Sequence, residues 1–150
     1  MVRLGIGLYG VDANKTIQQQ LKSVSTLKTT ISQIKKIKAG ESIGYSRRGI
    51  AEKDSVIATV RIGYADGYPR NLSNGIGKMW VNKKLVSVIG SVCMDMTMLD
   101  ITDVDAKEGD DVIVFGEKLP VSEFAEWAGT IPYEILTGIT KKIKRVYYEE

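Results

Sequence analysis

The chain has 150 residues, of which 43% are hydrophobic and 26% are charged, and it contains no histidine. The lack of histidine excludes Ser-His-Asp triads, Cys-His pairs and HExxH zinc sites. The single cysteine, Cys93, excludes a disulfide framework and a Cys-rich metal site, so we expect no metal. A net charge of +3 is too small to indicate a polyanionic partner. Acid–base chemistry must therefore come from Tyr, Lys, Asp, Glu or Cys.

The sequence predicts a cytoplasmic protein that does not bind a membrane. No stretch approaches the roughly 20 apolar residues of a membrane span. The apolar run over residues 4–9 is interrupted by Gly5 and Gly7 and has no longer apolar core behind it, unlike a signal peptide. A single cysteine fits a reducing compartment.

Residues 2–10 predict one short buried strand that ends in a glycine-rich turn. No strand–helix units accompany it, and a lone strand of this kind belongs to a larger sheet. We therefore expect this segment to be the tail of a domain that lies upstream.

The Ser- and Thr-rich segment 23–38 is the next predicted strand, because Leu27, Thr29 and Ile31 alternate as in a half-buried strand. Ile34 breaks this phase, which indicates a bulge or a bend. Leu27, Ile31 and Ile34 also fit helical spacing, so a helix is the alternative. The Thr and Ser content favours the strand.

Further short strands follow at close spacing. Polar turns and glycines separate them, which is typical of antiparallel β-structure. They are predicted at residues 56–62, 78–81, 85–89, 92–101, 112–115 and 143–148, and the second and third form a hairpin across residues 82–84.

Two short helices are predicted near the C-terminus. Ser122 can cap a helix over residues 123–128, and Gly129 can stop it. Pro132 suits the first turn of a second helix that Gly138 ends. Together these elements predict a mainly β fold, a small barrel or sandwich with two short helices near the C-terminus.

Three segments are candidates for carrying chemistry, and the first contains Tyr45. This tyrosine follows Gly44 and is close in sequence to Arg47 and Arg48. Nearby cations favour the phenolate form that a tyrosine base must reach. The alternative is a tyrosine that packs at the end of a strand.

The second segment, residues 61–70, is a loop that displays Tyr64, Asp66, Tyr68 and Arg70. Loops on a rigid sheet carry functional residues more often than their share. The alternative is a turn in which Asp66 only satisfies the local geometry.

The third segment, residues 90–96, begins a predicted strand that places Val92, Met94, Met96 and Met98 on one face. Such a methionine stripe is typical of core packing. Asp95 lies on the other face, and a carboxylate in a strand needs water or a partner.

These three segments occur in order between Val2-Arg3-Leu4-Gly5-Ile6-Gly7-Leu8-Tyr9-Gly10 and Pro132-Tyr133-Glu134. Together they resemble alanine racemase, the pyridoxal-phosphate enzyme of fold type III, from residue 2 to the C-terminus. Each of these five segments alone is weak evidence for the family. All five in the family's order and at nearly its spacing are strong evidence. The ending Tyr133-Glu134-Ile135-Leu136-Thr137-Gly138-Ile139 resembles the branch in which the racemase follows a muramyl-peptide ligase in one polypeptide.

The resemblance implies that residues 1–12 are the last strand of an upstream TIM-type barrel and residues 13–150 a C-terminal β-domain. In the family, the barrel binds most of the pyridoxal 5'-phosphate, as a Schiff base on an early lysine. That lysine precedes the matching segment, so we expect the isolated chain to be inactive. Two subunits pack head to tail and share each active site, which implies a homodimer that interconverts L- and D-alanine for peptidoglycan synthesis.

The resemblance also implies roles for individual residues. Tyr45 matches the catalytic tyrosine, which acts as the second base across the dimer interface. Arg3 matches the arginine at the pyridine nitrogen of the cofactor. Gly5 and Ile6 match positions whose backbone amides hold the cofactor phosphate, and Tyr133 matches a tyrosine that contacts the same phosphate.

For the substrate, Met94 matches the residue whose backbone amide binds the carboxylate. Tyr64 matches a tyrosine at the mouth of the substrate channel, and Arg70 and Asp95 match polar residues that line it. Racemisation removes the α-proton from one face and returns a proton on the other, so it needs two bases. An arginine at the pyridine nitrogen keeps its own proton, which leaves the ring a weaker electron sink.

Other functions fit parts of the sequence. A racemase for another small amino acid, such as serine, is the alternative within the enzyme class. A basic β-barrel could bind single-stranded nucleic acid through its Lys and Arg clusters and surface tyrosines. A purely structural dimerisation domain is the third alternative. We expect the alanine racemase domain that the resemblance implies, with no nucleic-acid partner.

Overall fold

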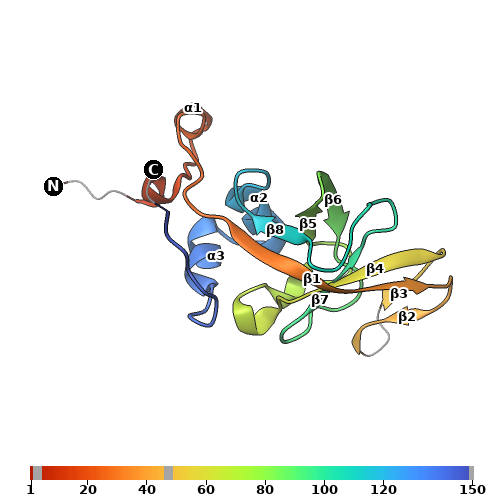
Figure 1. Cartoon of the computed structure of the whole chain (residues 1–150). Helices are drawn as coiled ribbons and strands as arrows, with labels where there is room; N and C mark the ends of the chain where they lie inside the picture. Colours follow the sequence, from red (N-terminus) through yellow and green to blue (C-terminus); the bar gives the residue numbers. More distant parts are fainter. Residues whose placement is uncertain (2–4, 46–48, 149–150) are drawn as a thin grey trace.

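The computed structural model describes residues 1, 5–45 and 49–148. Six strands form one antiparallel sheet in the order β6-β5-β8-β1-β4-β7 (Figure 1). The two edges of the sheet meet, because Val88, just after β6, bridges to Leu99 in β7, and the amide of Ile89 donates to the carbonyl of Met98 over 2.9 Å. The sheet is therefore a nearly closed barrel, as predicted. The strands are β1 (Leu27–Ile37), β4 (Ser55–Val60), β5 (Lys78–Val81), β6 (Lys84–Ser87), β7 (Thr97–Asp100) and β8 (Asp111–Phe115).

Strand β1 spans much of the sheet and contains two register shifts, between Leu27 and Lys28 and between Ile31 and Gln33. Its first half pairs with β8 and its second half with β4. A bulge increases the local twist, which lets one long strand follow the curvature of a barrel. The predicted strand and its irregularity are confirmed, and the helical alternative is excluded.

The hairpin β5–β6 turns through only two residues, because Val81 pairs with Lys84. Asn82 and Lys83 both have positive φ, at 42° and 69°. Positive φ at both central positions is the conformation of a type I′ turn, whose twist matches that of the flanking strands. The hairpin prediction is confirmed, with a loop one residue shorter than expected.

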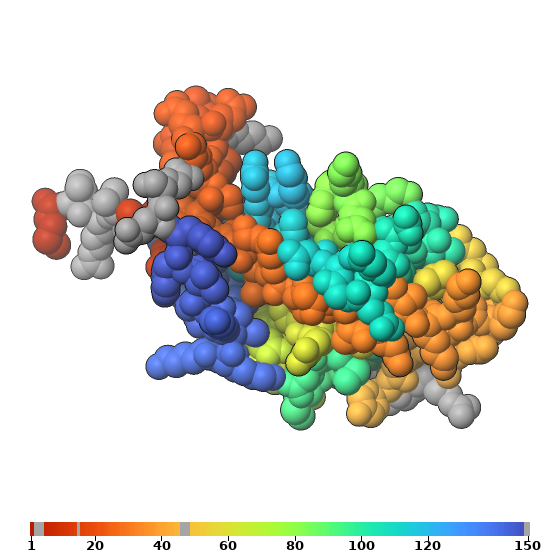
Figure 2. Space-filling model, in the orientation of Figure 1, coloured from red at the N-terminus to blue at the C-terminus, as the bar shows by residue number. Residues whose placement is uncertain are grey.

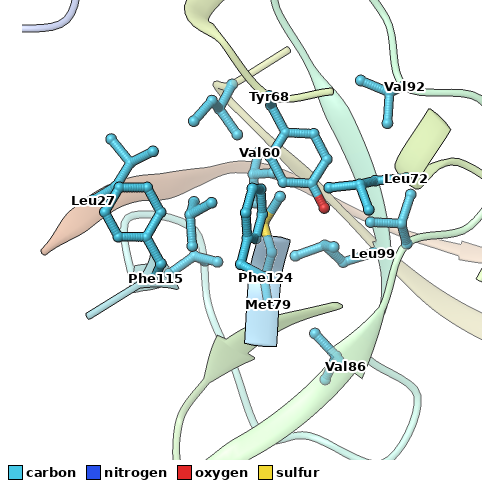
Figure 3. Close-up of a cluster of buried hydrophobic side chains, with 14 of the residues drawn as sticks. Leu27, Val60, Tyr68, Leu72, Met79, Val86, Val92, Leu99, Phe115 and Phe124 are labelled. Atoms are coloured by element: carbon cyan, nitrogen blue, oxygen red, sulfur yellow. The ribbon is translucent and has the colours of Figure 1, made fainter. Parts of the chain in front are cut away.

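The barrel interior continues into the helices near the C-terminus. Phe124 of α2 (Val121–Ala128) is 1% exposed and packs edge-on against Tyr68, with ring centroids 5.5 Å apart (Figure 3). Fully burying one such side chain contributes about 1.5–3 kcal/mol. The second helix, α3 (Pro132–Gly138), begins at its proline as predicted. Small elements complete the fold: η1 (Ile6–Tyr9), α1 (Lys15–Gln18), β2 (Ser42–Ile43), β3 (Gly49–Ile50), η3 (Tyr64–Asp66) and η4 (Arg70–Leu72).

Two predicted terminal strands are not formed within the residues that the structure describes. Ile6–Tyr9 is a 3-10 helix, while residues 2–4 lie outside the described residues. Residues 143–148 have no regular structure. A strand needs a neighbour for its hydrogen bonds, and closure between β6 and β7 leaves this sheet without a free edge for either segment.

Two other predictions were wrong in detail. The strand expected at 92–101 begins only at Thr97, because the amide of Cys93 donates to the carbonyl of Met96 over 2.9 Å and closes a turn. Ser122 does not cap α2, which begins at Val121, two residues earlier than expected, with Pro120 at the N-cap. Gly129 does end this helix, in the left-handed conformation.

Candidate functional site

Tyr45 is the second residue after β2, and it is 74% exposed. Gly44 before it has a φ of +73°, and a Cβ there would lie 2.8 Å from the terminal methyl carbon of Met98. The turn is therefore packed tightly onto β7 while the phenol points outward. This exposure argues against a tyrosine that merely packs at a strand end. Arg47 and Arg48 lie outside the described residues.

Cys93 is the point where the three candidate segments meet. Its thiol is buried, which raises the pKa of the Cys93 thiol, while the backbone amide of Tyr45 and the nearby charge of Arg70 act in the opposite direction. The carbonyl of Cys93 accepts a hydrogen bond from the amide of Tyr64 over 3.0 Å. The turn before Tyr45, the turn over residues 63–67 (the Tyr64 turn) and the loop over residues 93–96 (the Met94 loop) thus lie side by side.

Glycine at position 63 makes this contact possible. A Cβ there would lie 2.3 Å from the carbonyl oxygen of Cys93 and 2.4 Å from that of Met94. The amide of Ala65 donates to the carbonyl of Met94 over 2.9 Å, next to the bond made by Tyr64. Any side chain at Gly63 would push the two loops apart.

The Met94 loop, defined here as residues 93–96, presents both of its methionines to solvent. Met94 is 55% exposed and Met96 45%, whereas Val92 and Met98 are buried. The expected four-residue stripe is therefore wrong, since the turn at Cys93 breaks the alternation. Among the residues that the structure describes, the amide of Met94 donates to no acceptor. It is an open donor, which suits the binding of a carboxylate.

Lys142 joins this loop to the Tyr64 turn. Its ammonium nitrogen lies 3.0 Å from Oδ1 of Asp66, which is 4% exposed, and 2.5 Å from Oδ1 of Asp95, which is 53% exposed. These two carboxylates, Asp95 first, raise the pKa of Lys142. From the sequence, Asp66 is interpreted as a loop carboxylate or a turn residue and Lys142 has no assigned role, because nothing in the sequence signals this pairing.

A second group of predicted residues lies elsewhere. A Cβ on Gly5 would lie 3.2 Å from the hydroxyl oxygen of Tyr133 on α3, and Ile6 packs against the core. Tyr133 is 40% exposed, so its hydroxyl can reach a ligand. Arg3 lies outside the described residues.

The two groups occupy different ends of the molecule. The N-terminal segment and α3 lie at one end, while β2 and β3 lie at the other (Figure 1). Figure 2 shows the same separation on the surface, with the blue C-terminal region at one end and the orange β2–β3 region at the other. Within one chain, Tyr45 and Tyr133 therefore do not face a common ligand.

A surface hollow of about 400 Å³ lies between α3 and the loop over residues 64–71. Tyr64 borders it, together with Asn71 and Glu134, but neither Tyr45 nor Met94 does. In residues 1, 5–45 and 49–148, no three Cys, Asp or Glu side chains gather as a metal site would need. The described helices include none with the length and apolar character to cross a membrane.

Comparisons with known proteins agree on one family. The family model described as "Alanine racemase, C-terminal domain" matches residues 24–147. Alanine racemase of Clostridium novyi (strain NT) is 44% identical over 155 residues, covering 97% of this chain and 40% of that protein. Alanine racemase of Vesicomyosocius okutanii subsp. Calyptogena okutanii (strain HA) is 44% identical over 143 residues, covering 95% and 40%.

Solved structures give the same result. Alanine racemase from Streptomyces coelicolor A3(2) superposes with a TM-score of 0.92 at 31% identity, covering 99% of this chain and 41% of that one. Alanine racemase from Bartonella henselae with covalently bound pyridoxal phosphate gives 0.89 at 38% identity, covering 96% and 40%.

The fold defines this chain as a β-barrel domain of the kind that occurs as one part of these larger proteins. The chain belongs to the alanine racemase C-terminal domain family. It spans about 40% of the length of the curated relatives it matches.

Proposed function

We propose that this chain is the C-terminal domain of a cytoplasmic, pyridoxal-phosphate-dependent alanine racemase that interconverts L- and D-alanine for cell-wall peptidoglycan. Residues 1–12 would end an upstream barrel, and residues 13–150 would form the domain itself. The observation that carries the proposal is that Tyr45, which is exposed, and the loop with the open backbone amide of Met94 meet at Cys93.

The described residues fit the cofactor at the other end of the domain. Phosphate binding needs donors that approach closely without a side chain between them. Gly5 offers such a backbone next to the hydroxyl of Tyr133, and Ile6 follows it. These residues would hold the phosphate, and Arg3 would face the pyridine nitrogen. When bound, pyridoxal phosphate withdraws electrons from the substrate and makes its α-proton acidic.

The chain's own residues would then bind the substrate and transfer its proton. The Met94 amide binds the substrate carboxylate and orients the α-carbon. The Tyr45 hydroxyl holds or moves the α-proton on one face, and a base from the preceding barrel serves the other face. Tyr64, Arg70 and Asp95 line the approach to the site and restrict which molecules reach it.

The separation of the two groups supports a homodimer. Because Tyr45 lies at one end of the domain and Tyr133 at the other, one domain does not supply both to the same substrate. A second copy, packed head to tail, would bring Tyr45 of one chain to the phosphate-binding group of the other.

The direct test is racemisation by the full-length polypeptide that carries this domain. We expect conversion of L-alanine to D-alanine that depends on added pyridoxal phosphate after the cofactor is removed. L-Serine in the same assay decides between alanine and the serine alternative. Purified, folded protein that racemises neither amino acid would contradict the proposal.

A further inference from the structure

The segment after α3 is tied to the Tyr64 turn by both main chain and side chain. The amide of Thr140 donates to the carbonyl of Asp66 over 3.2 Å, and Lys142 reaches the Asp66 carboxylate. A Cβ on Gly67 would lie 2.4 Å from the carbonyl oxygen of Gly138. This close packing fixes the place from which the Lys142 side chain extends.

Asp66 is a strong anchor for Lys142 because its carboxylate is buried. Its other oxygen, Oδ2, accepts the amide of Gly63 over 3.0 Å. A buried carboxylate without a cation is costly, so loss of Lys142 would leave Asp66 uncompensated. Asp66 thus fixes the position of the Lys142 ammonium, which also forms an ion pair with Asp95.

We propose that Lys142 is a positioning residue that clamps the Met94 loop against the Tyr64 turn and so sets the substrate-carboxylate site. The inference rests on the proposed role of the Met94 amide. Asp95 follows Met94 directly, so a pull on its carboxylate orients the peptide that carries this open donor. Lys142 also neutralises Asp95, which would otherwise place a negative charge next to a site meant for a carboxylate.

Cys93 makes the clamp measurable without any racemisation. It is the only cysteine in the chain, it begins the Met94 loop, and its thiol is buried. A loop that opens more often exposes the thiol more often, so the rate of alkylation by iodoacetamide reports loop opening. The readout needs neither cofactor nor substrate.

The experiment follows alkylation at Cys93, measured by mass spectrometry of the peptide that contains it, in four forms of the full-length polypeptide: wild type, Lys142→Met, Lys142→Arg and Lys141→Met. Lys141 is the matched control, an exposed neighbouring lysine that has no ion pair among the residues described. We expect alkylation of Lys142→Met to be about fivefold faster than wild type. Lys142→Arg and Lys141→Met should stay close to wild type, since an arginine retains both ion pairs.

Kinetics with alanine give the second readout. For Lys142→Met we expect KM to rise about fivefold while kcat changes by less than about twofold, because carboxylate binding is affected and proton transfer is not. Unchanged alkylation and an unchanged KM in folded Lys142→Met would overturn the proposal. Equal drops in kcat for Lys142→Met and Lys142→Arg would overturn it as well.

Two further points keep the test decisive. Should Lys142→Met fail to fold, Asp95→Asn removes only the exposed half of the clamp and leaves the Lys142–Asp66 pair in place. We again expect faster alkylation of Cys93 in this variant. An alkylation rate equal to that of wild type would refute the clamp. A wild type without racemase activity refutes the proposed function, whereas the alkylation rates still decide whether Lys142 holds the loop.

Discussion

The hydroxyl of Tyr133 lies so close to Gly5 that a Cβ added to this glycine would stand 3.2 Å from the phenol oxygen. The two residues lie near opposite ends of the chain, one before η1 and the other in the first turn of α3. Their contact joins the N-terminal segment to the C-terminal helices. The proposed phosphate site would therefore bridge these two parts of the domain.

Changes at this contact should weaken cofactor binding. In the full-length polypeptide, Tyr133→Phe should raise the Kd for pyridoxal phosphate about tenfold, because it would remove the proposed hydrogen bond to a charged phosphate. Absorbance titration of the cofactor-free protein measures this. Tyr148→Phe, in an exposed tyrosine near the C-terminus, is the control and should leave the Kd unchanged. Equal Kd values for Tyr133→Phe and wild type would remove Tyr133 from the phosphate site.

The variant Tyr45→Phe should lose most racemisation and keep its cofactor absorbance. Removing a group that transfers a proton costs about 10²–10⁴-fold in rate. The ring of Tyr45 is 74% exposed, so loss of its hydroxyl should leave the fold intact, which circular dichroism checks. Normal turnover by this variant would exclude Tyr45 from the mechanism.

Mixed dimers test whether Tyr45 acts across the subunit interface. We expect Tyr45→Phe and Gly5→Asp, each impaired alone, to recover about a quarter of wild-type activity after mixing and subunit exchange. If each site takes Tyr45 from one chain and Gly5 from the other, one of the two sites in a mixed dimer is intact. Half of the dimers are mixed after exchange of equal amounts, so a quarter of all sites are active. If both residues served a site within one chain, every site would keep one defect and mixing would restore nothing.

Tyr68 offers a stability prediction, because its hydroxyl has no hydrogen-bond partner among the residues described. The side chain is fully buried, with its oxygen directed into the core near Leu72 (Figure 3). Burial raises the pKa of Tyr68 far above its usual value. Tyr68→Phe removes an unpaired buried polar group and should raise the free energy of unfolding by about 1 kcal/mol.

Urea unfolding of this domain measures the change, with Tyr68→Ala as the comparison. The alanine variant leaves a cavity against Phe124 and should lose about 3–5 kcal/mol. A clear loss of stability in Tyr68→Phe would mean that the hydroxyl has a partner, such as a buried water.

Asp110 should contribute to acid sensitivity. Its carboxylate accepts the amide of Lys107 over 3.0 Å and the side-chain amide of Asn82 over 2.8 Å, and these bonds, in that order, lower the pKa of Asp110. A carboxyl whose pKa is lower in the folded state stabilises the fold above its unfolded pKa, near 3.8. That contribution is lost as the pH falls through the lowered pKa. Unfolding free energies measured from pH 6 downward should fall less steeply for Asp110→Asn than for wild type, and identical slopes would contradict this.

Elements with local signals were predictable. The alternation in β1, the presence of the β5–β6 hairpin and the proline that begins α3 are all properties of neighbouring residues, although the hairpin loop is one residue shorter than expected. The prediction of a strand over residues 92–96 was wrong because the tertiary contacts of this segment differ from what its local pattern indicates. Its alternating pattern suits a strand, but a hydrogen bond from the amide of Cys93 to the carbonyl of Met96 closes a turn that presents Met94 to solvent.

By itself, the sequence determined the kind of residues available for chemistry: tyrosines in place of histidines, one cysteine, and motifs in an order typical of one family. Only the tertiary structure decided which of them meet. It brought the turns before Tyr45 and Tyr64 to Cys93, and it paired Lys142 with Asp66 and Asp95. The physical reason is that hydrogen bonds and ion pairs depend on distances of about 3 Å, which barrel closure creates between residues far apart along the chain.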